Sequence, residues 1–383
     1  MSGAYIRGMG LSCALGTDVE TCITAMQQMQ IRPVHVQLDG FDEPMRIPYY
    51  RIPDGGDLFD DSRFTRLLVP VVRAAIVQAG LSAVELRRLP LFTGSSCFSI
   101  GSSEVQYAKA LAEGSGAALP MPLCGYQDIG EIIRRTLGCA GDTYAYNTAC
   151  TASANALLGA LRMLEMGWYR HALVVGVELA NLTTLTGFSG LQLVADTIQP
   201  FDANRKGMVF GEGIGAVVLS THPGDVGGLR VVGGTNNCDT HSVTTANPQG
   251  DSVAAVLSST LEQIKLQAGQ IRGIKAHATA TPTGDTAEAA GMHQVFDSLP
   301  PVSALKPFIG HTMGACSINE LVLFGGALQK GFLPASTAVE TPDPILGVSP
   351  LTAPVAAPDG YYLLNHFGFG GNNTVLAVEK FTP

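Results

Sequence analysis

Cys150 is the residue whose place in the sequence most favours nucleophilic chemistry. It follows a β-type run, Thr143 to Asn147, and precedes a run from Ala156 to Leu164 in which apolar residues recur at helical spacing. The first N–H groups of a helix and the helix dipole favour a thiolate over a thiol, so we expect Cys150 to be more nucleophilic than an average cysteine. Taken alone, the stretch fits a small buried side chain better, since most single cysteines are of that kind.

Two histidine motifs in the second half of the chain reverse this balance. One extends from Lys275 to Asp285 and contains His277, and the other extends from Lys306 to Ala315 and contains His311. A third stretch, residues 365–373, places two phenylalanines among glycines. Each stretch carries polar residues at the end of a predicted strand and then enters a turn of small residues. Together they make catalysis by Cys150 the better hypothesis.

The elements that must position these residues alternate between strands and helices in both halves of the chain. Two continuous apolar runs, His171 to Leu179 and Gly211 to Ser220, are typical of strands covered on both faces. Proline and glycine at residues 223–228 separate a second cycle of strands and helices from the first. We therefore expect two α/β lobes, residues 1–222 and residues 223–383.

One long segment of the first half does not fit this alternation. The polar, proline-containing stretch from Asp39 to Asp61 predicts an irregular surface excursion. Apolar periodicity then predicts a helix from Arg63 to Gln78.

Composition limits the kinds of protein that this chain can be. The 383 residues carry a net charge of −9, which argues against nucleic acid or an anionic membrane as the main partner. Eight cysteines without a CxxC pair indicate reduced thiols. The chain begins without a basic segment followed by an apolar core, and no apolar run approaches the ~20 residues that span a bilayer. We therefore expect a cytoplasmic protein that binds neither nucleic acid nor membrane.

Five short motifs resemble, in order and spacing, the signature set of the β-ketoacyl-acyl-carrier-protein synthases, the elongating condensing enzymes of fatty-acid and polyketide synthesis. They are Thr-Ala-Cys-Thr at 148–151, Pro-Phe-Asp at 200–202, His-x-Thr-x-Thr-x-x-Gly-Asp-x-x-Glu at 277–288, Lys-x-x-x-Gly-His-x-x-Gly-Ala at 306–315 and Asn-x-Phe-Gly-Phe-Gly-Gly-x-Asn at 365–373. The resemblance implies the thiolase fold, with two similar lobes in five layers, αβαβα. It also implies a dimer formed through strands next to the nucleophile.

The resemblance assigns catalytic roles to a few residues. Cys150, His277 and His311 match the catalytic triad, and Lys306 and Glu320 match its supporting charged residues. In such enzymes the cysteine accepts an acyl group from the carrier protein, and malonyl thioester then loses carbon dioxide. Two neutral histidine N–H donors stabilise the enolate oxygen that results. No metal and no separate cofactor is implied, because phosphopantetheine of the acyl carrier protein holds the substrates.

Other positions match the substrate path. Phe369 matches the phenylalanine whose backbone N–H completes the oxyanion hole and whose ring gates the acyl channel. Thr279 and Thr281 match residues that hold the phosphopantetheine arm, and Met208 and Phe367 are expected beside the substrate.

Several residues depart from the usual pattern of the family. Ala278 replaces a glycine, Met208 replaces a phenylalanine and Asn372 replaces a threonine. These departures indicate a specialised substrate. We interpret His366, where a small residue is usual, as a packing variation.

Partner and alternative functions complete the expectations. Carrier proteins of this type are acidic, so we expect docking on a local basic patch that includes Arg63 and Arg66. The dimer could be a homodimer or a heterodimer with a related ketosynthase-like subunit.

The main alternative to a condensing enzyme is a chain-length factor, the non-catalytic partner of a condensing subunit, although such partners usually lack the cysteine or a histidine. A papain-like protease does not explain the two histidine motifs, and thiolases and initiation synthases differ at the histidine positions.

Overall fold

The centre of the molecule is a ten-stranded mixed sheet to which each half of the chain contributes five strands. The computed structural model describes residues 3–38, 44–60, 62–98, 100–114, 128–224 and 228–382. The strands of the first half are β1 (Ala4–Cys13), β4 (Leu91–Gly94), β5 (Thr143–Tyr146), β6 (His171–Glu178) and β8 (Gly213–Ser220). Those of the second half are β9 (Leu229–Cys238), β10 (Ile271–Lys275), β11 (Val302–Ser303), β14 (Gly360–Phe367) and β15 (Asn372–Lys380).

The two halves of the sheet have the same topology. The strands of the two halves lie in the spatial orders β1-β8-β6-β4-β5 and β9-β15-β14-β10-β11. When the five strands of each half are numbered 1 to 5 in chain order, both spatial orders become 1-5-4-2-3. In each half the first two pairings are antiparallel and the last two are parallel. The halves join where β1 pairs with β9, Ala4 opposite Val231 and Tyr5 opposite Arg230.

Helices fill the space between the two halves of the sheet and cover both outer faces. The helices are α1 (Val19–Gln27), α2 (Arg63–Ala79), α3 (Ala83–Arg87), α4 (Ile100–Ala112), α5 (Asp128–Leu137), α6 (Ala152–Glu165), α7 (Leu182–Gly190), α8 (Asp251–Ile264), α9 (Pro282–Val295), α10 (Lys306–Ile309) and α11 (Cys316–Gln329). Three short 3₁₀ turns are η1 (Ala268–Gln270), η2 (Met313–Ala315) and η3 (Phe369–Gly371).

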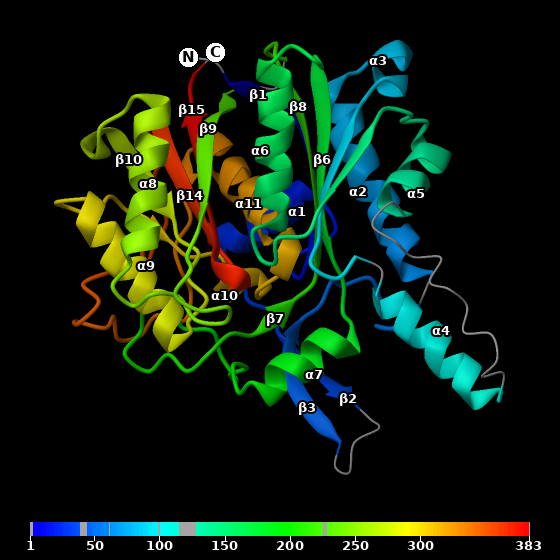
Figure 1. Ribbon diagram of the computed structural model, residues 1–383, viewed down its shortest axis with the longest axis horizontal. Helices are drawn as coiled ribbons and strands as arrows, with labels where there is room; N and C mark the ends of the chain where they lie inside the picture. The colour runs from blue at the N-terminus through cyan, green and yellow to red at the C-terminus, as the bar shows by residue number, and fades with distance from the viewer. Residues whose placement is uncertain are drawn as a thin grey trace.

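Five layers can be followed from left to right in Figure 1. Helices α8 and α9 cover the sheet of the second half, α6 and α11 lie between the two half-sheets, and α2 and α5 cover the sheet of the first half. The middle layer is the most deeply buried, since every residue of α11 from Cys316 to Leu328 is buried. The helix that follows Cys150 and the helix that carries Glu320 therefore share a dry interior between the lobes.

A small second sheet projects from the first half and corrects one prediction. It contains β2 (Val34–Leu38), β3 (Met45–Tyr50) and β7 (Phe210–Gly211). Residues 45–50 lie within the stretch predicted to be irregular, so that prediction is wrong there. The reason is pairing with β2 and with the distant β7, which buries Ile47, Tyr49 and Tyr50. The rest of the predicted excursion includes residues 39–43 and 61, which lie outside the described residues.

The remaining short strands, β12 (Phe332–Leu333) and β13 (Val355–Ala356), form a separate antiparallel pair. The predicted division of the chain at residues 222 and 223 falls between β8 and β9 and stays a prediction. In the part of the chain that the structure describes, no helix is both long enough and apolar enough to cross a bilayer.

Candidate active site

Cys150 lies in the turn that connects the end of β5 to the start of α6. The preceding residue, Ala149, has a φ of +50°, a left-handed conformation that residues with a side chain rarely adopt. Gly368 packs directly against this turn, since a Cβ there would lie 3.1 Å from the backbone N of Cys150. The backbone N–H groups of Phe369 and Cys150 lie near the thiol and favour its charged form.

The thiol of Cys150 is protonated at neutral pH. Burial raises the pKa of Cys150 to about 12, although Lys306 and the N–H of Phe369 act in the opposite direction. Burial thus acts against the thiolate that the helix terminus favours, and the greater nucleophilicity expected of Cys150 stays a prediction. A proton acceptor is close, since Nε2 of His311 lies 3.1 Å from Sγ of Cys150.

Lys306 orients His277 and selects its tautomer. Its Nζ donates to the backbone O of His277 at 2.5 Å and lies 3.4 Å from Nδ1 of the same residue. Because an ammonium group can only donate, Nδ1 accepts, and the neutral ring carries its proton on Nε2. Burial, and then the charge of Lys306, hold the pKa of His277 well below its ordinary value. His277 is therefore a neutral N–H donor.

Glu320 on α11 binds two buried lysines at once. Its Oε1 accepts from Lys306 at 2.8 Å, and its Oε2 accepts from Lys275 at the end of β10. All three side chains are at most 1% exposed. Lys275 also donates to the backbone O of Asn365 at 2.7 Å and lies 3.3 Å from Nδ1 of His366. Lys275 is not among the residues predicted for the site.

The two histidines face the same cavity as Cys150. The ring centroids of His277 and His311 lie 5.5 Å apart at an interplanar angle of 86°. Burial, and then Lys306, lower the pKa of His311 well below its ordinary value, so both rings are neutral. Phe367 packs edge-on against His277 with centroids 5.7 Å apart and lines the cavity, and its place beside the substrate stays a prediction.

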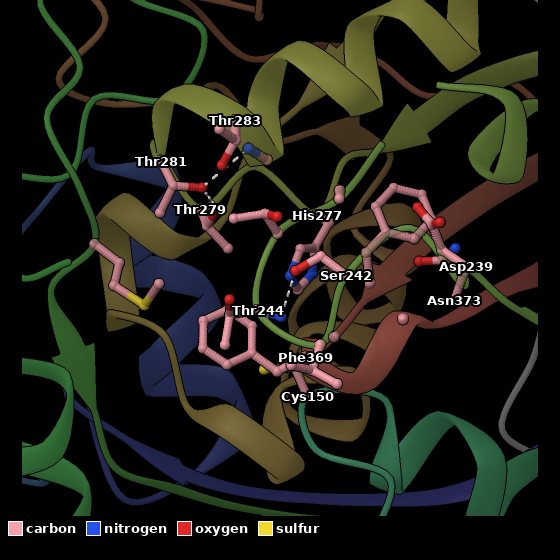
Figure 2. A pocket seen from close by; sticks show the side chains of 18 of the residues that line it. Cys150, Asp239, Ser242, Thr244, His277, Thr279, Thr281, Thr283, Phe369 and Asn373 are labelled. Carbon is pink, nitrogen blue, oxygen red and sulfur yellow. Dashed lines mark hydrogen bonds between the residues drawn. The ribbon is translucent and has the colours of Figure 1, made fainter. Parts of the chain in front are cut away.

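The cavity above Cys150 opens to solvent. Figure 2 shows Thr279, Thr281 and Thr283 together on one wall, with Cys150 and Phe369 on another side of the cavity. The hydroxyl oxygens of Thr279 and Thr281 lie 3.0 Å apart. Further hydroxyl groups come from the loop after β9, at Ser242, Thr244 and Thr245. The path to the sulfur therefore offers a series of neutral hydrogen-bonding groups.

Aromatic residues close the opposite side of the cavity. Phe369 stacks on Phe188 of α7, with centroids 5.2 Å apart and an interplanar angle of 29°. Phe188 packs edge-on against Phe210 at 5.1 Å. Met208 is buried and lines the same cavity. Phe188 is a cavity residue that the sequence motifs did not indicate.

Two family models match the sequence of this chain. The model "Beta-ketoacyl synthase, N-terminal domain" matches residues 60–223, and "Beta-ketoacyl synthase, C-terminal domain" matches residues 230–340. The chain belongs to the β-ketoacyl synthase family. The predictions of the family and of a condensing enzyme of the acyltransferase class are thereby confirmed.

Two curated relatives of this β-ketoacyl synthase cover almost the whole chain. The 3-oxoacyl-[acyl-carrier-protein] synthase 2 of Mycobacterium tuberculosis is 26% identical and covers 98% of this chain and 97% of its own. Nodulation protein E of Rhizobium leguminosarum bv. trifolii is 28% identical and covers 98% of each chain.

Solved structures confirm the thiolase-like fold of this family member. A ketosynthase in complex with its chain length factor from Xenorhabdus doucetiae matches with a TM-score of 0.88 at 23% identity, covering 99% of this chain and 98% of that chain. The ishigamide ketosynthase/chain length factor matches with a TM-score of 0.87 at 25% identity, covering 100% of both chains.

One of the two arginines predicted to dock the carrier protein is inaccessible in this synthase. Arg63 is 1% exposed and binds Glu212 and Asp54, so its place in a surface patch was wrongly predicted. The buried carboxylate of Glu212 draws the guanidinium inward. Arg66, whose side chain is 45% exposed, binds Asp54 and Asp60 and remains a docking prediction.

Three ligand-type atoms lie close together behind the cavity. Donor atoms of His277, Cys316 and His366 lie within 4.8 Å of one another, and all three residues are buried. The ammonium groups of Lys306 and Lys275 approach the two histidines and would repel a cation. That no metal is required stays a prediction.

Glu178, the last residue of β6, holds two segments of the site together. Its Oε2 accepts from the backbone N of Ser96 and of Gly314, each at 2.9 Å, and its Oε1 accepts from the N of Cys97 at 3.0 Å. Burial raises the pKa of Glu178 to about 6 although these donors favour the charged form. Because Gly314 follows His311 closely, Glu178 fixes the histidine loop to the end of β6 and to the loop that follows β4.

Proposed function

We propose that this chain is a β-ketoacyl-acyl-carrier-protein synthase that condenses malonyl carrier with an acyl group held on Cys150, in fatty-acid, polyketide or polyene synthesis. The observation that supports it most strongly is the convergence of one thiol and two neutral imidazoles on one cavity. Lys306, Glu320 and Phe369 take the supporting roles that the resemblance implies.

The first step transfers the acyl group to the enzyme. Sγ of Cys150 attacks the acyl carbon of the thioester, and the bond from that carbon to the carrier sulfur breaks. Nε2 of His311 receives the thiol proton across 3.1 Å and returns it to the departing carrier thiolate. The backbone N–H groups of Cys150 and Phe369 lie near the sulfur, and we assign them to the oxyanion that forms beside it.

The second step forms the carbon–carbon bond. Malonyl carrier loses carbon dioxide, and the electron pair of the broken bond forms an enolate whose thioester oxygen carries charge. His277 donates Nε2–H to that oxygen. After acyl transfer the proton of His311 moves from Nδ1 to Nε2 by exchange with solvent, and His311 then donates to the same oxygen. The enolate carbon attacks the acyl carbon, the bond to Sγ breaks, and the Cys150 thiolate takes a proton from solvent. Because burial raises the pKa of Cys150 to about 12, the sulfur is reprotonated before the next cycle.

Acyl carrier protein is the proposed partner, and its phosphopantetheine enters past Thr279 and Thr281. No separate cofactor is proposed. One similar solved structure is titled as a type II PKS acyl-carrier protein in complex with its ketosynthase, and another as a ketosynthase with its chain length factor. We also propose that the protein is cytoplasmic, as the pattern of cysteines led us to expect.

A two-fold assembly is proposed through β5. This strand ends the sheet of the first half, and among the described residues no strand pairs with its outer edge. Its residues from Thr143 to Tyr146 are alternately exposed and half-buried, which suits pairing with the same strand of a second subunit. That subunit is another copy of the chain or a related ketosynthase-like protein.

A chain-length factor remains the second candidate, because similar structures contain such subunits. Retention of Cys150, His277 and His311 in one cavity favours the catalyst. Incubation with acyl carrier and malonyl carrier separates the two. The synthase should release carbon dioxide and form β-ketoacyl carrier, whereas a chain-length factor alone should form none.

A further inference from the structure

Lys275 is buried beside the catalytic residues, yet among the described residues its ammonium group bonds to partners other than His277, and Lys275 does not line the cavity that substrate enters. It comes from the end of β10, two residues before His277, and is fully buried. Its three hydrogen-bond partners are Oε2 of Glu320, the backbone O of Asn365 and Nδ1 of His366. Burial lowers the pKa of Lys275, whereas the carboxylate of Glu320 favours the ammonium form, and these three acceptors use all three protons of that form.

Lys306 shares the same carboxylate but has a different set of acceptors. Its three protons are directed at Oε1 of Glu320, at the backbone O of His277 and at Nδ1 of His277. The carboxylate is therefore divided, one oxygen for each lysine. Since Lys275 occupies Oε2, Lys306 has no second carboxylate oxygen to bind and directs its remaining protons to His277.

We propose that Lys275 is a positioning residue, which holds Oε2 of Glu320 so that Lys306 donates to Nδ1 of His277 and keeps the proton of that ring on Nε2. The inference deepens the proposed function, on which its catalytic meaning rests. Without Lys275, Oε2 would be a buried charged oxygen without its cation, and it would compete with Nδ1 for the third proton of Lys306. His277 would then sample both tautomers, and one of the two enolate donors would be lost.

The charged and titratable groups around His277 agree with this arrangement. Burial, Lys306, His311, Lys275 and His366 all lower the pKa of His277, in that order. Removing the charge of Lys275 should therefore also let His277 take up a proton at higher pH. The groups that surround the ring from each element are Lys275 on β10, Glu288 on α9, Lys306 on α10, Cys316 and Glu320 on α11, His366 on β14, and His311 and Cys150 in the loops that face the cavity.

The test is a nitrogen NMR experiment on ¹⁵N-histidine-labelled protein without substrate, with His277 assigned by its loss in His277→Gln. In the wild type we expect a neutral ring with its proton on Nε2 at neutral pH. In Lys275→Met we expect a mixture of tautomers and protonation at higher pH than in the wild type. Lys330→Met is the matched control, because Lys330 binds Glu20 at the exposed end of the same helix that carries Glu320.

Two results would overturn the proposal. A folded Lys275→Met protein with wild-type His277 signals would overturn it. If that variant does not fold, Lys275→Gln replaces it, since its amide can still donate to Asn365. The wild-type spectrum is itself decisive, because a mixture of tautomers there would contradict the inference. None of these NMR signals depends on turnover. A failed condensation assay would therefore refute the proposed function, whereas the role of Lys275 would still be decided by the NMR spectra.

Discussion

Nε2 of His311 lies 3.1 Å from Sγ of Cys150, so a buried thiol faces an uncharged imidazole. Burial raises the pKa of the thiol to about 12, and burial, followed by Lys306, lowers that of the imidazole. Transfer of the proton at rest would create two charges in a site that disfavours each of them. The pair is therefore neutral at rest, and the proton moves only when the sulfur attacks a substrate.

This resting state predicts the pH dependence of alkylation at Cys150. Iodoacetamide reacts with thiolate, and far below the pKa the thiolate fraction rises about tenfold for each pH unit. We expect the labelling rate to rise throughout the range from neutral to mildly alkaline pH, as followed by peptide mass with Cys150→Ser as the control. A rate that is already constant at neutral pH would show an ionised thiol and contradict the assigned pKa.

Glu178→Gln should loosen the histidine loop. An amide nitrogen would replace one carboxylate oxygen and face backbone N–H groups of Ser96, Cys97 or Gly314. We expect a loss of about 1–3 kcal/mol in the free energy of unfolding, measured with urea at neutral pH. Glu379→Gln, in a more exposed ion pair with Arg230, is the control and should cost less.

The pH dependence of that loss has a defined sign. The folded pKa of Glu178 is raised to about 6, above its ordinary value, so the folded protein binds this proton before the unfolded chain does. Glu178 therefore adds stability as the pH falls through 6, and the difference between wild type and Glu178→Gln should widen. A difference that narrows over the same range would contradict the assignment.

Replacement of Arg63 should lower stability, whereas replacement of Arg66 should weaken the binding of carrier protein. Arg63→Met leaves Glu212 and Asp54 without their shared cation, and breaking such a buried pair costs about 3–5 kcal/mol in unfolding free energy. Arg66→Glu should leave stability nearly unchanged but raise the KM for carrier protein and flatten its salt dependence. An unchanged KM across ionic strengths would remove Arg66 from the docking surface.

The assembly prediction rests on the free outer edge of β5. Light scattering at micromolar concentration should give twice the mass of one chain, alone or after addition of the related subunit. Replacing Ala145 by proline should weaken the assembly, because proline cannot donate a ladder hydrogen bond. A stable monomer under both conditions would count against it.

The meeting of the three candidate catalytic residues could be predicted because each lies inside a short motif with fixed spacing. Cys150, His277 and His311 meet in one cavity as the resemblance implied. The ionisation of Cys150 could not be predicted, since a sequence indicates the helix that follows it but not how deeply the turn is buried. The fold was predicted in outline from alternating strands and helices, and the second sheet was missed because β3 depends on pairing with the distant β7.

Charged residues were the hardest to place. Arg63 begins a helix, where a charged side chain usually meets solvent, and its burial follows from Glu212, 149 residues away. Lys275 offered a signal that was missed. The period of two in a strand places it on the same face of β10 as Ile271 and Gly273, which are buried. Its partner Glu320 lies 45 residues along the chain and could not be inferred from spacing.

The central claim is that Cys150 carries the acyl group while both histidines act in condensation, and intact-mass analysis with acyl carrier alone tests it most directly. Wild type should gain one acyl group per chain, lost in Cys150→Ala. Folded His277→Gln should retain much of the adduct while its condensation rate with malonyl carrier falls by ~10²–10³. A wild-type Cys150 that stays unmodified with several acyl lengths, and with any related subunit present, would contradict the account and favour a chain-length factor.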